Sequence, residues 1–413
     1  MGAPVSSRAE QTVLVCALIG TAQMTWGVTV PVLPVYLDSY GIAVGLIGPL
    51  VAAFAVGRII ANIPAGLALR RFPARTYLRV VLLALAAVTA LTGLAGAAGP
   101  LIGFRLFAGV LGGAAVTVGF ALLVAGAPPA RRGAVMATAT VVQMSTAGAG
   151  ALLGGAVVGL AGPAWTFAVA ALPVLAVLLW DLARPAAHYW SFAAPAPRRG
   201  GVRAGGPARV KVPKRTWLLV ALCAEAFATF FVRFAGEQGL VPVLAYDSGG
   251  LKPFTLGLAT AAGTVASLAA MPLIARWVDR GARIALLVPA GIAGAVAMLC
   301  LPLLHVPAGF AVAIVAYSLA TSVIGVLPGV ITGDAFPASA AGGVIGLTRT
   351  AGDIGAAIGP LAVFAVAGFA GYQAACAVLA ALFLVAAAGL VTALLRHRAS
   401  QATVAAPILV GAP

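Results

Sequence analysis

Charged side chains are scarce in this 413-residue sequence. Asp, Glu, Lys and Arg together make up 8% of the residues, and only nine of them are acidic. A soluble globular domain carries about 25% charged residues, so this deficit excludes an ordinary water-soluble fold. With 62% of its residues hydrophobic, the chain is expected to lie in a membrane.

Lysine, cysteine and histidine are also rare. The net charge is +16, but only three basic residues are lysines and none alternates with aromatic residues as a base-stacking surface requires. The four cysteines lie singly inside apolar runs without CxxC spacing, which argues against disulfides and a metal site. HExxH and GxSxG motifs are absent, so we expect no enzyme. The sequence therefore predicts no nucleic-acid partner, no metal and no cofactor.

Apolar runs long enough to cross a bilayer recur twelve times, since a spanning helix needs about 20 residues. They cover residues 13–37, 45–69, 77–98, 101–125, 134–161, 164–183, 217–245, 254–277, 284–304, 308–332, 342–369 and 371–395. Between the sixth and seventh runs, the sequence holds eight basic residues, no acidic residue and many Pro and Gly, which is typical of an exposed linker.

The predicted fold is an all-α membrane protein with twelve transmembrane helices in two pseudo-symmetric six-helix bundles. The predicted segments are an N-terminal tail (1–12), the first bundle (13–183), a basic linker (184–215), the second bundle (216–396) and a C-terminal tail (397–413). If both termini are cytoplasmic, 20 of the 25 basic residues fall on the cytoplasmic side and only Lys252 falls outside. This follows the positive-inside rule. The arginine-rich composition is typical of GC-rich bacterial genes, so we expect a multi-pass protein of the bacterial inner membrane with cytoplasmic termini.

The two halves of the chain resemble each other at a nearly constant offset of 209 residues. Gly41 and Gly48 match Gly250 and Gly257, and further glycines follow the same offset. Parallel repeats of this kind are typical of secondary transporters, which bind substrate between the repeats near the bilayer midplane.

The sequence resembles the major facilitator superfamily over essentially its whole length. The family motif G-x-L-A-D-R-x-G-R between helices 2 and 3 is similar to the segment that begins at Gly66 and contains Arg70, in place of the Asp, and Arg71. The second half keeps more of it, as Asp279, Arg280 and Arg283. The resemblance implies a charge latch at the cytoplasmic gate, whose acidic partner in the first half is lost or lies elsewhere. Alternatively, these arginines only set the topology.

Two further motifs are similar to those of the drug:proton antiporter branch with twelve helices. Arg105 lies in a segment that resembles the arginine motif of helix 4, which implies a part in proton coupling. Gly150 and Gly154 resemble the glycines of the antiporter motif in helix 5, with Ala151 in place of its Pro, and Gly359 with Pro360 stands at the equivalent place in helix 11. The resemblance implies that these residues take part in gating.

Seven ionisable residues lie away from the ends of the predicted spans, and at the bilayer centre each costs about 2.5–3.5 kcal/mol and so needs a partner, water or a function. They are Arg58, Arg105, Glu225, Arg233, Glu237, Arg349 and Asp353. The four-residue spacings of Arg233 with Glu237 and of Arg349 with Asp353 predict intrahelical pairs. Either these pairs only neutralise each other, or one carboxylate exchanges its arginine for a proton. Glu225 has no arginine at such a spacing.

Isolated polar residues on otherwise apolar helices are the candidate substrate contacts, since such walls suit an amphiphilic ligand. They are Gln23, Trp26, Gln143, Tyr317 and Thr321, each of which equally fits helix packing. The leading hypothesis is a monomeric, proton-driven exporter of a small hydrophobic or amphiphilic compound, with lipid and protons as its other partners. The alternative is an uptake permease for a sugar, an amino acid or another small metabolite.

Overall fold

The computed structural model describes residues 5–69, 71–127, 131–183, 216–336 and 338–405, and all regular elements in them are helices. Arg70 and the predicted linker 184–215 lie outside the described residues. The first half contains α1 (Val5–Ser39), η1 (Val44–Leu46), α2 (Ile47–Ala68), α3 (Ala74–Thr92), α4 (Ala98–Gly126), α5 (Arg132–Ala161) and α6 (Pro163–Ala183). The second half contains α7 (Thr216–Val232), η4 (Arg233–Leu240), α8 (Val241–Asp247), α9 (Pro253–Asp279), α10 (Arg283–Cys300), η5 (Leu301–Leu303), α11 (Pro307–Ala335) and α12 (Ala338–Ala405).

Eleven helical stretches among the described residues are long and apolar enough to cross a membrane. The last, Gly343–His397, is 55 residues long and bends at Gly371, so it makes two spans and the total is the predicted twelve. Two helices extend beyond the predicted spans. α1 begins at Val5, ahead of residue 13, and α12 continues to Ala405, past residue 396, because neither terminal segment contains a helix-breaking residue at those points.

The two halves repeat the same backbone bends. Gly162 ends α5 with φ 85° and ψ 169°, and Gly371, 209 residues later, divides α12 with φ 83° and ψ 168°. Gly41 and Gly250 are a second such pair, with φ of 63° and 62°. Positive φ values are strained for residues with a Cβ atom, so glycine is required at these turns. The internal repeat seen in the sequence is therefore present in the backbone.

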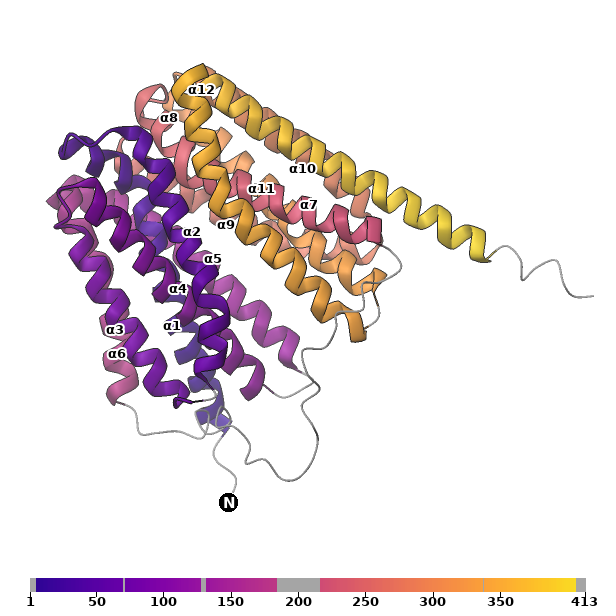
Figure 1. Ribbon diagram of the computed structural model, residues 1–413, viewed down its shortest axis with the longest axis horizontal. Helices are drawn as coiled ribbons and strands as arrows, with labels where there is room; N and C mark the ends of the chain where they lie inside the picture. The colour runs from indigo at the N-terminus through magenta and orange to yellow at the C-terminus, as the bar shows by residue number, and fades with distance from the viewer. Residues whose placement is uncertain (1–4, 70, 128–130, 184–215, 337, 406–413) are drawn as a thin grey trace, which may run out of the picture.

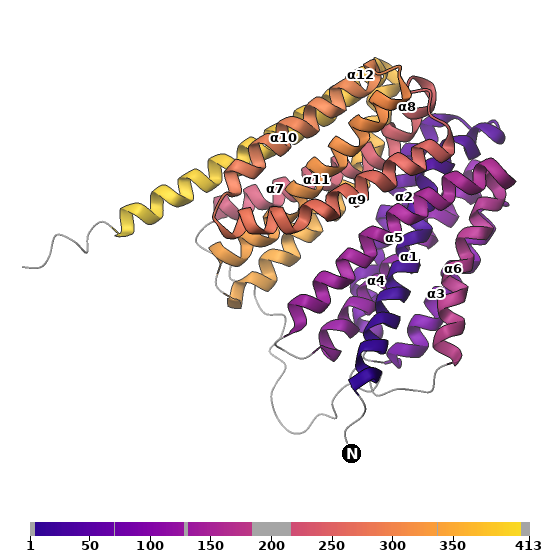
Figure 2. The ribbon, with the colours of Figure 1, turned by 180° about the vertical axis from the view of Figure 1, so that it is seen from behind.

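The halves form a V that is closed at one end and splayed at the other (Figures 1 and 2). α5 against α9 and α2 against α12 make the main contacts between them. The splayed end is the one at which α1 begins, and it carries Arg71, Arg75 and Arg283, so we call it the basic end. At the closed end, Tyr246 of α8 donates a hydrogen bond to the carbonyl oxygen of Pro31 in α1 at 2.5 Å.

Candidate functional site

The candidate site is a cavity of about 210 Å³ between the two halves. It adjoins a smaller cavity of about 50 Å³ at the face of η4 and α11. Its charged and polar lining comes from α1, α2 and α5 of the first half and from η4, α9 and α12 of the second. The lining includes Gln23, Trp26, Arg58, Gln143, Arg233, Glu237, Gln238, Thr260, Thr264 and Arg349. Predicted substrate and proton-coupling residues from both halves thus meet in one place.

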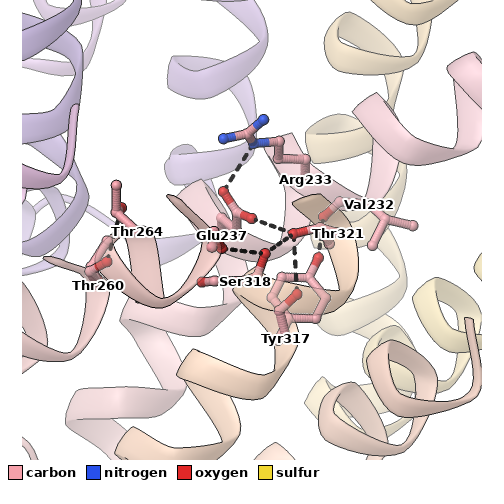
Figure 3. A network of polar contacts seen from close by, with 9 residues as sticks. Val232, Arg233, Glu237, Thr260, Thr264, Tyr317, Ser318 and Thr321 are labelled. Carbon is pink, nitrogen blue, oxygen red and sulfur yellow. Dashed lines mark hydrogen bonds and ion pairs between the residues drawn. The ribbon is translucent and has the colours of Figure 1, made fainter. Parts of the chain in front are cut away.

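One predicted ion pair is formed, and it lies in an unusual helical segment. Arg233 Nε donates to Glu237 Oε2 at 3.1 Å, and both residues belong to the π-helix η4. Thr321 Oγ1 of α11 donates to the other oxygen, Glu237 Oε1, at 3.1 Å, as Figure 3 shows. Tyr317 Oη donates to the carbonyl oxygen of Val232 at 2.9 Å, where α7 passes into η4. π-Helical turns are rare in proteins overall, and those that occur are often found at functional sites.

The second predicted pair is not formed. In the described part of the chain, Arg349 and Asp353 make no ion pair with each other. Instead Asn62 Nδ2 of α2 donates to Asp353 Oδ2 at 3.0 Å, and Thr117 Oγ1 of α4 donates to Asn62 Oδ1 at 3.3 Å. The spacing along α12 allowed a pair, but α2 packs against α12 and supplies a partner for Asp353 from the other half. Asn62 was not predicted, although it lies one turn from Arg58 inside an apolar span.

Aromatic side chains from both halves meet at the cavity. Trp26 stacks on Phe54 with ring centroids 6.0 Å apart, and its ring centroid lies 5.4 Å from that of Phe234 in the second half. Arg105 is buried, with its guanidinium carbon 4.8 Å from the centroid of the Phe54 ring. Arg58 lies 5.9 Å from the Phe234 centroid. Arg105 therefore contacts the site through an aromatic ring.

Glu225 lies apart from the cavity. Its side chain is fully buried on α7, and neither carboxyl oxygen has a hydrogen-bond partner among the described residues. The structure thus gives Glu225 no arginine partner from another helix. By contrast, Gln143 Nε2 and Gln23 Oε1 form a direct hydrogen bond of 3.2 Å between α5 and α1 at the cavity wall.

The predicted gating glycines lie at helix crossings within each half. A Cβ atom at Gly150 or Gly154 would lie 2.4 or 2.5 Å from a carbonyl oxygen of α1, and one at Gly359 would lie 2.7 Å from a carbonyl oxygen of α7. Pro360, the next residue, lies instead at the contact between the halves, where its carbonyl oxygen faces Gly48. Gly66 has open space around it.

The three predicted latch residues of the second half do not act as one cluster. Asp279 and Arg280 are exposed at the basic end, and Arg283 forms an ion pair with Asp334 of α11. In the first half, Arg71 is exposed. Two arginines near it form ion pairs with Asp181, a residue that was not predicted to take part. Asp181 of α6 accepts from Arg75 Nε at 3.1 Å and also from Arg79 Nε. This acid ties α3 to α6 within one half.

We expect Asp181→Asn to lower the free energy of unfolding by about 2–3 kcal/mol. Its side chain is 1% exposed, and removing one member of a buried ion pair leaves the other without compensation. The effect lies below the usual range because Arg79 is 31% exposed. Unfolding of the purified protein by SDS in mixed micelles measures it. The matched control is Asp334→Asn, whose acid is 47% exposed and should lose below about 1 kcal/mol. Equal losses in the two variants would contradict the prediction.

Comparison with known proteins agrees with this architecture. The sequence matches the family described as Major Facilitator Superfamily over residues 15–235 and 226–408. No curated protein matches the chain. The fold is similar to that of the nucleoside transporter NupG, with a TM-score of 0.72, 11% identity and coverage of 93% of this chain and 98% of that one.

A second similar structure is the inward-facing, occupied form of a bacterial homologue of the human lysosomal transporter Spinster. The TM-score is 0.68 at 15% identity, with 95% of this chain and 96% of that one covered. The unoccupied form of the same protein gives a TM-score of 0.65 at 13% identity. These likenesses show the fold. Because the family match spans nearly all of both halves, the chain belongs to the Major Facilitator Superfamily and is a secondary transporter.

Proposed function

We propose that this protein exports a small hydrophobic or amphiphilic compound in exchange for protons. The observation that carries the proposal is the cavity between the halves, whose wall combines aromatic and apolar side chains with polar and charged ones, and holds or adjoins carboxyl groups. Such a mixed lining suits an amphiphilic ligand, which has both an apolar body and polar groups. Rocking of the two halves about this cavity would expose it to each side of the membrane in turn.

Protons supply the energy in this proposal, and no cofactor is required. One proton moving inward down 100 mV releases about 2.3 kcal/mol, which supports a substrate gradient of roughly fiftyfold. The candidate proton sites are Glu225, Glu237 and Asp353. Arg58, Arg105, Arg233 and Arg349 are the candidate partners that change with protonation. The polar lining residues, together with Tyr317 and Thr321 behind η4, are the candidate substrate contacts.

The proposed setting is the bacterial inner membrane, with the basic end in the cytoplasm and the protein working as a monomer. The charge distribution supports this orientation, because arginines gather at the end where α1 begins. In this orientation the splayed end of the V faces the cytoplasm, where an exporter loads its substrate (Figures 1 and 2). Residues 1–12, 184–215 and 397–413 would then lie on the cytoplasmic side.

Flux in proteoliposomes tests the proposal. A pH gradient, acidic on the side that represents the cell exterior, should drive an amphiphilic fluorescent substrate toward that side while the opposite compartment acidifies. Liposomes without protein and liposomes with a collapsed gradient are the controls. Movement of substrate and protons in the same direction would replace export by the uptake alternative. Substrate movement that ignores the gradient would exclude proton coupling.

A further inference from the structure

The carboxylates at the cavity wall already accept hydrogen bonds. Both oxygens of Glu237 accept, one from Arg233 and one from Thr321. Gln23 Oε1 accepts from Gln143, and the neighbouring Asp353 accepts from Asn62. A cationic ligand would therefore have to displace Arg233 from Glu237 before it met a free carboxylate at this wall.

Hydrogen-bond donors at the same wall are left over. Trp26 lines the cavity, is 6% exposed, and its Nε1 is buried without a partner among the described residues. Arg58 and Arg349 also line the cavity, and within the described ranges neither forms a hydrogen bond or a close ion pair. An indole can only donate, and a guanidinium carries five donors and no acceptor. The ligand that completes this site is one that accepts hydrogen bonds.

The net charge of the cavity wall is positive, which favours the same kind of ligand as the unpaired donors do. Arg58, Arg233 and Arg349 line the cavity against a single acid, Glu237, which Arg233 neutralises. Asp353 stands outside the lining but attracts both Arg58 and Arg349, so three arginines face two acids and the net charge is +1. An excess of positive charge favours an anion, and arginine pairs with carboxylate and phosphate groups through two parallel hydrogen bonds.

The aromatic wall lies next to these donors. Trp26 touches Phe54 and Phe234, and Phe230 stacks on Phe234 with centroids 6.3 Å apart. Flat rings of this kind contact a flat apolar ligand body over a large area. Arg58 lies 5.9 Å from the Phe234 centroid, so the aromatic surface and a free guanidinium are adjacent.

We propose that the substrate class is amphiphilic organic anions, compounds with an aromatic body and one carboxylate, sulfonate or phosphate group. The anionic group binds Arg58 and Arg349, the body stacks against Trp26 and Phe234, and Trp26 Nε1–H donates a hydrogen bond to an acceptor atom of the ligand. The inference rests on the proposed function only in that the cavity carries the substrate. The proposed anions have the opposite charge to the cationic substrates that an acidic cavity would select.

Equilibrium binding to the purified full-length protein, without any proton gradient, tests this class. The probes are 2-naphthoate, 2-naphthylmethanol and 2-naphthylmethylammonium, which share a ring system and differ in charge. We expect the anion to bind at least tenfold more tightly than the neutral compound, and the cation to bind most weakly. Equal affinities, tightest binding of the cation, or no binding of the anion up to about 1 mM would overturn the inference.

Variants of the two arginines distinguish loss of the positive charge from misfolding of the protein. Arg349→Gln and Arg58→Gln should each weaken 2-naphthoate binding at least tenfold and leave the neutral compound unchanged, whereas Arg349→Lys should retain part of the preference. Arg276→Gln is the control, since Arg276 is exposed on α9 outside the cavity lining. Loss of both ligands in all the cavity variants reports misfolding, in which case the anion preference of the wild type alone decides.

The outcomes distinguish this inference from the function on which it builds. Anion-selective binding without pH-driven flux supports the substrate class and contradicts proton-coupled export. Proton-driven movement of a lipophilic cation without anion binding keeps the exporter and overturns the substrate class.

Discussion

Replacing Gly155 with valine is expected to open the closed end of the V and to slow transport at least fivefold. Gly155 of α5 faces Pro253 at the start of α9, and an added Cβ atom would lie 2.2 Å from the Pro253 carbonyl oxygen. The obstacle is backbone, so only separation of α5 from α9 relieves it. Overpacking costs about 1–3 kcal/mol, which shifts a two-state equilibrium roughly 5- to 150-fold.

Distances between spin labels measure this shift. Ser39 and Val306 are suitable sites, because both are exposed at the closed end and they belong to different halves. The labels are attached in a background with the four native cysteines replaced. The matched control is Gly159→Val on the same helix, where a Cβ atom meets nothing within 4 Å. Identical distance distributions for the two valine variants would show that the contact does not set the closed state.

Two more close contacts between a glycine and a backbone carbonyl join the halves. A Cβ atom at Gly48 would lie 2.8 Å from the Pro360 carbonyl oxygen, and one at Gly257 would lie 2.4 Å from that of Ala151. Gly48 and Ala151 map to Gly257 and Pro360 at the offset of 209. The two contacts are therefore related by the internal repeat. Both join opposite halves, so both must separate when the closed end opens.

Several features of this structure could be predicted from the sequence because they depend on local properties. A spanning helix needs only a sufficient apolar run, and the twelve predicted runs correspond to the observed helices. The repeat likewise could be predicted, since Gly162 and Gly371 keep the same residue type where the backbone requires positive φ. The Arg233–Glu237 pair followed from spacing, because both residues lie on one helical segment.

Contacts between helices could not be predicted in this way. The Asn62–Asp353 hydrogen bond joins residues 291 positions apart, and nothing in either segment identifies the other as its partner. Asp181 is similar, since its arginines lie on α3 and it lies at the end of α6. Asn62, Asp353 and Asp181 are all polar residues in apolar helices, so the sequence indicates that each needs a partner but does not identify that partner. The three-dimensional arrangement of the helices supplies the partner.

Glu225→Gln is expected to reduce pH-driven flux at least tenfold while substrate exchange at equal pH continues. A group that exchanges a proton must be able to stand uncharged, and Glu225 has no arginine beside it that would hold it charged. Glu237 is bound by Arg233 and Thr321, and Asp353 by Asn62, whereas both oxygens of Glu225 are unpaired. Glutamine has the shape of the protonated form, so it removes the proton exchange and leaves the packing of α7 in place.

Parallel measurements on the other acids decide the assignment. Asp247→Asn is the control, because Asp247 is exposed at the closed end, outside the cavity. If Glu225→Gln and Glu237→Gln both leave pH-driven transport unchanged, the helix formed by α7 and η4 does not carry the proton. Loss only in Asp353→Asn would place coupling at the Asn62 contact instead. Because that contact joins the two halves, protonation there would act directly on the rocking motion, whereas protonation of Glu225 must act through α7.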